Sequence, residues 1–184
     1  MNRIIGILMT ILFLTSCVNS KESEIENPNG IWTEPELVEL NSLVSKFDQI
    51  LISEYKSESI TKAYVEFSNR ALNDMAIPDL IGYDKINSVA KNLKIFDKIW
   101  KKHTDSISNK NHFSLKYNSN YQKYLKGVGE NSEMIKDYAD KFEYTGDIAP
   151  SVVAFLLQNI EKIDLNNKTT RLILTIHYIT LINR

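Results

Sequence analysis

The sequence is poor in the residue types that define several common functional classes. Its single cysteine excludes a disulfide framework, and three histidines with one cysteine leave little material for a zinc site. The formal net charge of −1 gives no global reason to expect nucleic-acid binding. Hydrophobic residues make up 43% of the chain, which is too many for a disordered protein. These features indicate an ordinary globular domain with no metal site.

Catalytic motifs are also missing from the sequence. It contains no Gly-x-Ser-x-Gly elbow, no Walker loop and no His-Glu-x-x-His pattern. The Gly127-Val128-Gly129 segment lacks the third glycine of a dinucleotide fingerprint, and His177 lies in an apolar stretch that favours a core histidine. We therefore expect no catalytic residues and no cofactor, and we predict that the protein is not an enzyme. A glycosidase with two carboxylates far apart in the chain stays open as an alternative.

The first informative segment lies at the N-terminus. Arg3 precedes an almost unbroken apolar run over residues 4–14, and Leu14-Thr15-Ser16-Cys17 follows it. The run is about eleven residues long, whereas a membrane-spanning helix needs about twenty. It therefore reads as the hydrophobic region of a signal peptide.

The four residues that end at Cys17 resemble the lipobox of bacterial lipoproteins. This resemblance implies a signal peptide over residues 1–16 and a lipid anchor on Cys17, which attaches the protein to a membrane. No aspartate follows Cys17, which in that family favours the outer membrane. The polar residues that come next predict a flexible tether over residues 17–31. An ordinary signal peptide with an incidental free cysteine is the alternative.

The remaining residues, 32–184, predict a single all-α domain. Thr33 and Glu36 form a capping-box pattern, and apolar residues then recur at helical spacing for about twenty residues. The last apolar stretch would also suit a central strand, but its length favours a buried helix. The expected fold is a bundle of six or seven helices around this C-terminal helix, with a long loop over residues 104–118. After the first helix, further helices are expected at about 59–73, 84–103, 119–127, 132–144, 147–163 and 169–181.

The near-zero net charge conceals a strongly basic middle. Residues 91–126 hold nine lysines and two acidic residues, whereas both flanking regions are acidic. On a helix over residues 84–103 five lysines fall on one face, opposite an apolar face. This pattern favours a cationic binding surface, and the alternative is a solvated face partnered by the acidic first helix. The five lysines are Lys91, Lys94, Lys98, Lys101 and Lys102.

Three tyrosines form a second candidate for the binding surface. Tyr117, Tyr121 and Tyr124 recur at helical spacing with lysines between them. Interleaved tyrosine and lysine side chains can stack on sugars or bases. The alternative is an aromatic helix face that packs on the core.

Together these features predict an outer-membrane lipoprotein with a helical binding or scaffold domain in the cell envelope. Its expected partners are a protein or an anionic envelope component, such as lipid headgroups or an acidic glycan, and not nucleic acid. The protein would face the periplasm or the cell surface. The alternative function is an immunity protein that inhibits a periplasmic toxin or hydrolase, because small lipidated helical proteins of this size resemble some of those.

Overall fold

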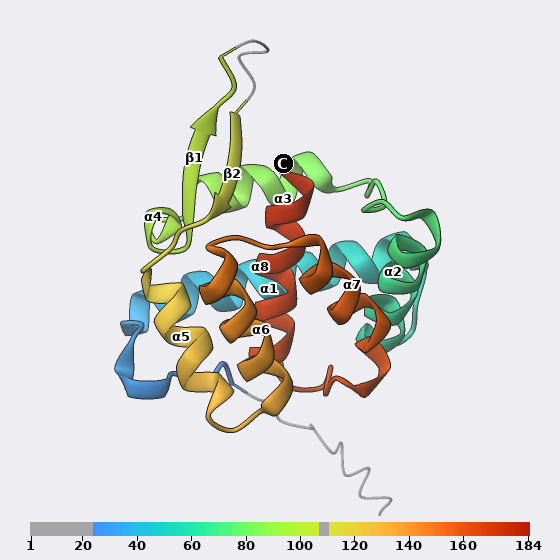
Figure 1. Cartoon of the computed structure of the whole chain (residues 1–184). Helices are drawn as coiled ribbons and strands as arrows, with labels where there is room; N and C mark the ends of the chain where they lie inside the picture. The colour runs from blue at the N-terminus through green and yellow to red at the C-terminus, as the bar shows by residue number, and fades with distance from the viewer. Residues whose placement is uncertain (1–23, 107–110) are drawn as a thin grey trace, which may run out of the picture.

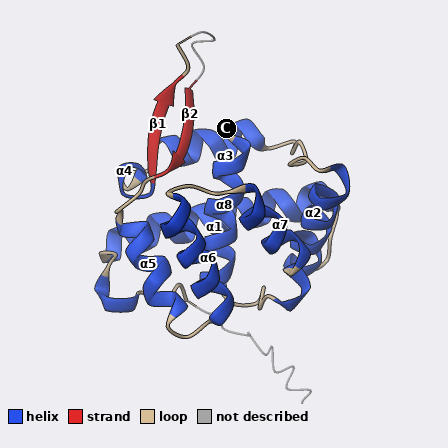
Figure 2. Ribbon diagram, viewed as in Figure 1, coloured by secondary structure: helices blue, strands red, loops and turns tan. Residues whose placement is uncertain are grey.

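A computed structural model describes residues 24–106 and 111–184, and the predicted signal peptide and Cys17 lie outside this part. The described residues form eight α-helices, two short 3-10 helices and one two-stranded antiparallel sheet (Figures 1 and 2). The expectation of a mainly helical fold is confirmed, but the expected number of six or seven helices and the expectation of a purely all-α fold are wrong. The elements are η1 (Pro28–Gly30), α1 (Glu34–Tyr55), α2 (Ile60–Asp74), α3 (Tyr83–Lys91), α4 (Phe96–Ile99), β1 (Trp100–Thr104), β2 (Asn111–Leu115), α5 (Asn120–Gly129), α6 (Glu133–Thr145), α7 (Pro150–Gln158), η2 (Ile160–Lys162) and α8 (Lys168–Ile182).

The C-terminal helix α8 runs through the middle of the molecule, as the sequence predicts (Figure 1). Every residue from Thr169 to Thr180 is buried. A helix enclosed by neighbours on all sides needs no polar face, which explains why its sequence is mainly apolar and β-branched. Several buried polar groups find partners on this helix: the Tyr178 hydroxyl bonds to Ser68, and Trp100 Nε1 donates to Thr180 Oγ1 over 2.8 Å.

A buried ion pair links α8 to α1. The Arg171 guanidinium lies 3.2 Å from the Asp48 carboxylate, and both side chains are almost fully enclosed. The Tyr64 hydroxyl of α2 donates to Asp48 and also bonds to Thr175, each over 3.0 Å. These charged and polar groups therefore satisfy one another inside the core and connect three helices.

Local sequence signals set the ends of several helices. The Glu36 carboxylate accepts from the Thr33 amide over 2.9 Å, as in a capping box, and α1 begins there as predicted. Ser119 and Ser132 cap the first turns of α5 and α6. Gly146 ends α6 in a left-handed conformation, with φ of 67°, which glycine adopts without strain.

The single helix expected over residues 147–163 is wrong in two respects. Helix α7 ends at Gln158, and the short turn η2 follows it. At this helix end the Phe155 carbonyl accepts from both the amide and the side chain of Asn159. Asp147 does not cap α7, because its carboxylate accepts from the next amide, that of Ile148, and pairs with Arg184.

The helix expected over residues 84–103 is also wrong, and so is the loop expected over residues 104–118. Helix α3 ends at Lys91, and the chain passes through the single turn of α4 into strand β1. Strand β1 then pairs with β2, which lies inside the predicted loop. Strand pairing depends on residues far along the chain, so the local spacing of apolar residues did not reveal it.

Part of the segment predicted to be a flexible tether, residues 24–31, packs on the helical domain. Ile25 and Trp32 are buried, and the Glu26 amide donates to Thr169 Oγ1 over 2.7 Å. The Asn27 side chain bonds to both the amide and the carbonyl of Trp32. Residues 24–31 therefore belong to the folded domain and fix the chain at the start of α8.

Candidate binding surface

The two-stranded sheet is a hairpin that projects from the helical body near the C-terminus (Figure 1). An isolated hairpin is only marginally stable in water, so its base must pack on other elements. Trp100 and Phe113 supply that base, with ring centroids 6.0 Å apart, and Phe96 lies 5.5 and 5.4 Å from them. The Trp100 indole also donates to Thr180 of α8. These contacts fix the hairpin to the centre of the bundle.

The rest of β1 is polar and exposed. Lys101, Lys102, His103 and Thr104 all lie open to solvent, whereas only Trp100 is buried. His103 Nε2 bonds to Ser114 Oγ across the hairpin over 2.8 Å. Because side chains alternate along a strand, Lys101 and Lys102 point to opposite faces. The hairpin therefore presents positive charge on both of its faces.

The five lysines of the predicted binding surface do not lie on one helix. Lys91 ends α3, with its ammonium 5.7 Å from the Phe113 ring centroid, and Lys94 lies in the link to α4. Lys98 of α4 forms an ion pair with Glu36 of α1. Lys101 and Lys102 lie on β1. The structure thus keeps these lysines along one continuous stretch of chain, but on four different elements.

The ion pair between Lys98 and Glu36 gives one of the five lysines an acidic partner in α1. For this lysine the alternative interpretation, a face partnered by the acidic first helix, is the one that holds. Partial burial would raise the pKa of the Glu36 carboxyl, but the bonds from Lys98 and the Thr33 amide outweigh it and lower that pKa. The Lys98 ammonium is therefore engaged in an ion pair within the domain, so we do not include it in the candidate binding surface. Lys94, Lys101 and Lys102 have no carboxylate partner among the described residues.

Lys116 also lies beside this group, although its position in the sequence does not predict this. It follows β2 directly, and its ammonium donates to the Asp97 carbonyl over 2.9 Å. Only the pairing of the strands brings it beside α4. We call the set formed by Lys94, Lys101, Lys102, His103 and Lys116 the basic hairpin surface.

The three tyrosines are divided between surface and core. Tyr117 is 48% exposed, whereas Tyr121 and Tyr124 of α5 are fully buried and stack with centroids 6.4 Å apart. Burial raises the pKa of both buried phenols well above the ordinary tyrosine value. Tyr121 and Tyr124 therefore cannot stack on a sugar or a base, and their helix face packs on the core.

Antiparallel pairing brings together two histidines that lie apart in the sequence. His103 and His112 are direct partners in the register of the hairpin. The third, His177, is buried in α8, with Nδ1 3.2 Å from the Tyr138 hydroxyl. Residues 24–106 and 111–184 contain no group of three or more histidine, cysteine, aspartate or glutamate residues placed to hold a metal ion.

Two open cavities lie away from the hairpin. One, of about 360 Å³, is a cleft between α1 and α3 that includes Lys46, Lys56 and Lys85. The other, of about 520 Å³, is a mainly apolar groove between α2 and α7. Neither contains the aligned nucleophile and base that catalysis would need. In the described part of the chain, no helix has the length and hydropathy to span a membrane.

Comparison with known proteins gives no relative. No protein-family model, curated protein or solved structure matches this chain. The functional proposal therefore depends on the residues and geometry of the basic hairpin surface.

Proposed function

We propose that the protein is a lipid-anchored component of the bacterial outer membrane, whose helical domain binds an anionic partner in the cell envelope through the basic hairpin surface. The observation that carries this proposal is the projecting hairpin, which exposes Lys101, Lys102 and His103. In the part of the chain that the structure describes, no acidic side chain forms an ion pair with either lysine. Groups of like charge without internal partners favour association with a surface of opposite sign.

The position of the N-terminal segment supports a particular orientation. Glu26 contacts Thr169 at the start of α8, whereas Phe113 of the hairpin contacts Asn183 just beyond its end. Helix α8 has 15 residues, so about 22 Å of helix separates these two points. The lipid on Cys17 would lie only seven residues before Glu24, which is at most about 25 Å of extended chain.

An anchor at one end of α8 thus favours presentation of the hairpin at the other end, away from the membrane that holds the lipid. This arrangement favours a protein or an acidic glycan as the partner over the lipid headgroups of that same membrane. The acidic partner would meet the hairpin first, because it is the part of the domain farthest from the anchor.

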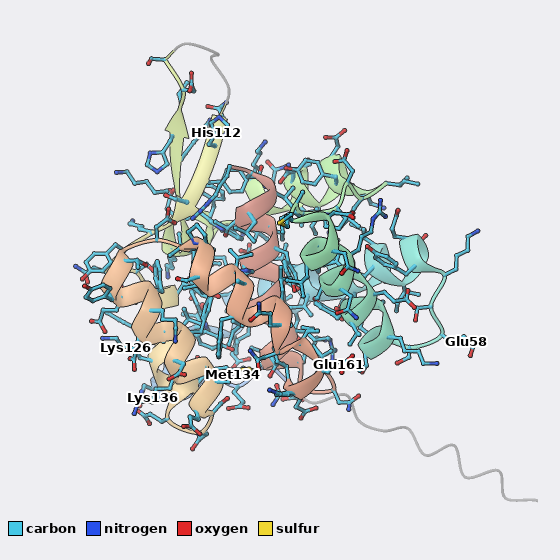
Figure 3. All side chains as sticks on the ribbon, turned by 45° about the vertical axis from the view of Figure 1, so that its right-hand side comes forward. Glu58, His112, Lys126, Met134, Lys136 and Glu161 are labelled. Atoms are coloured by element: carbon cyan, nitrogen blue, oxygen red, sulfur yellow. The ribbon has the colours of Figure 1, made fainter. Side chains whose placement is uncertain are left out.

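Crosslinked recovery of partners from intact cells tests the proposal. We expect Lys101→Glu with Lys102→Glu to reduce partner recovery at least about tenfold, because attraction becomes repulsion at both faces of the hairpin. The matched control is Lys123→Glu with Lys136→Glu, two exposed lysines on α5 and α6. Figure 3 shows Lys136 at the end of the molecule opposite His112. Unchanged recovery after the hairpin substitutions would contradict the proposed binding surface.

The anchor has a separate test. Cys17→Ser should release the protein from the membrane fraction, because the thiol is the site of lipid attachment in the lipoproteins that the N-terminus resembles. Continued membrane association of this variant would show that the anchor is not a lipid on Cys17.

A further inference from the structure

The hairpin has two edges, and hydrogen bonding shows which backbone groups point outward from each. The Lys116 amide donates to the Ile99 carbonyl over 2.8 Å, and the register pairs Trp100 with Leu115 next to them. In an antiparallel pair, hydrogen-bonded and non-hydrogen-bonded partners alternate. Lys101 and His103 therefore bond inward to β2, whereas the amides and carbonyls of Lys102 and Thr104 point outward.

The opposite strand confirms this alternation. Phe113 is the register partner of Lys102, so its amide must also point outward. It donates to the Asn183 carbonyl at the end of α8, over 3.2 Å. The outer edge of β2 is thus partly occupied by the helical body.

The outer edge of β1 is free in the described part of the chain. The Trp100 amide donates to the Phe96 carbonyl, but the outward amides of Lys102 and Thr104 have no backbone partner among the described residues. The register continues through five consecutive pairs without a bulge, and β1 contains no proline. Of the features that usually block pairing at a strand edge, namely proline, a bulge and charged side chains, β1 has only the charged side chains of its lysines.

We propose that the outer edge of β1 accepts an extended acidic segment of a partner protein as a third strand. This inference rests on the proposed function, and it specifies how the basic hairpin surface recognises its partner. Both backbone groups of Lys102 and the Thr104 amide lie on exposed residues and offer up to three main-chain hydrogen bonds, whereas the buried Trp100 is covered by the helical body. Strand addition of this kind takes its affinity from the main chain and its specificity from alternating side chains.

Charge selects the occupant. Lys101 and Lys102 lie on opposite faces of β1, so neighbouring acidic residues on an added strand would each meet a lysine. A second copy of this chain, paired antiparallel about Lys102, would place Lys102 directly against Lys102. Like charges opposite each other destabilise a pair of strands, which disfavours self-association at this edge.

Proline substitutions at the two edges provide a matched test. Thr104 and Asn111 are register partners whose amides both point outward, on β1 and β2 respectively. Proline at either position removes an outward amide without removing a ladder bond, which an edge strand tolerates. Both changes also remove the side-chain bond between Thr104 and Asn111, of 3.0 Å. Only Thr104→Pro alters the edge that we assign to the partner.

The probe is a synthetic peptide with two neighbouring glutamates between short runs of valine and threonine, added to the full-length lipidated protein in detergent. We expect Thr104→Pro to weaken peptide binding at least about tenfold, while Asn111→Pro changes it less than about twofold. Peptide binding should also slow hydrogen exchange at the Lys102 and Thr104 amides of the wild-type protein. A second probe, the same peptide with N-methyl groups on alternate amides, should bind the wild-type protein at least about tenfold more weakly.

Several outcomes would overturn the inference. Equal binding by the two proline variants would overturn it, as would undiminished binding of the N-methylated peptide. Failure of the wild-type protein to bind the peptide, or equal binding of a lysine-for-glutamate version, would reject the acidic strand as occupant. If the Lys101→Glu and Lys102→Glu variant loses its cellular partner while both proline variants retain it, the proposed function stands and strand addition is wrong.

Discussion

At the scale of single residues, His177 is held neutral inside the core. Its Nδ1 bonds to Tyr138, and its ring packs edge-on against Tyr178 with centroids 5.4 Å apart. Burial, together with the nearby charge of Arg184, lowers the pKa of His177 to about 3. The apolar stretch around His177 predicts a core histidine, and the Tyr138 hydroxyl bonds one of its two ring nitrogens.

This shift predicts an acid-sensitive fold. In the unfolded chain His177 has a pKa near 6.5, so between about pH 6.5 and pH 3 the unfolded state binds one more proton than the folded state. Stability therefore falls as the pH falls through this window. From about pH 6 to pH 4 the wild-type protein should lose about 2 to 3 kcal/mol more unfolding free energy than His177→Gln, measured by urea denaturation. Identical pH slopes for the two proteins would contradict this prediction.

At the scale of elements, the helices that formed as predicted are those with strong local signals. Helices α1, α2, α5, α6 and α8 each carry a cap or an apolar periodicity within their own sequence. The segment over residues 91–104 has helical spacing too, but it becomes a helix end, a single turn and a strand. Its apolar residues Phe96 and Trp100 meet Phe113 of β2, and this distant contact decides the local conformation.

The contact between α5 and α6 depends on a glycine. A Cβ atom on Gly129 would lie 2.9 Å from the Lys136 Cα and 3.1 Å from its amide nitrogen. Because these are backbone atoms, Gly129→Ala must move α5 relative to α6, and we expect a loss of about 1 to 3 kcal/mol in unfolding free energy.

Gly82→Ala is the matched control for Gly129→Ala. The three atoms nearest to its Cβ all belong to the half-buried Ile50 side chain, the closest 2.9 Å away, and a side chain can shift by a few tenths of an ångström more easily than a helix backbone. Chemical denaturation should therefore show a clearly smaller loss for Gly82→Ala. A Gly129→Ala variant as stable as the wild-type protein would show that the two helices can separate without cost.

At the scale of the whole molecule, the segment over residues 24–31 joins the folded domain through Ile25, which is part of the core. Ile25 is buried and neighbours Glu26, which bonds to the start of α8. Ile25→Ala should therefore lower the unfolding free energy by about 2 to 4 kcal/mol. The control is Val38→Ala on the exposed face of α1, which should change it by less than about 0.5 kcal/mol. If Ile25→Ala and Val38→Ala have equally small effects on thermal or urea unfolding, residues 24–31 form a flexible tether and not a part of the fold.

The sequence by itself determined the helical character of the domain and the burial of its C-terminal helix. These features follow from periodicity and caps, which act within a few residues along the chain. Only the tertiary structure decided that Lys101 and Lys102 lie on a strand, that His103 faces His112 and that Lys116 joins them. It also decided that Tyr121 and Tyr124 are core residues. These outcomes depend on pairing and packing between segments that lie far apart in the sequence. Local sequence patterns do not reveal such contacts.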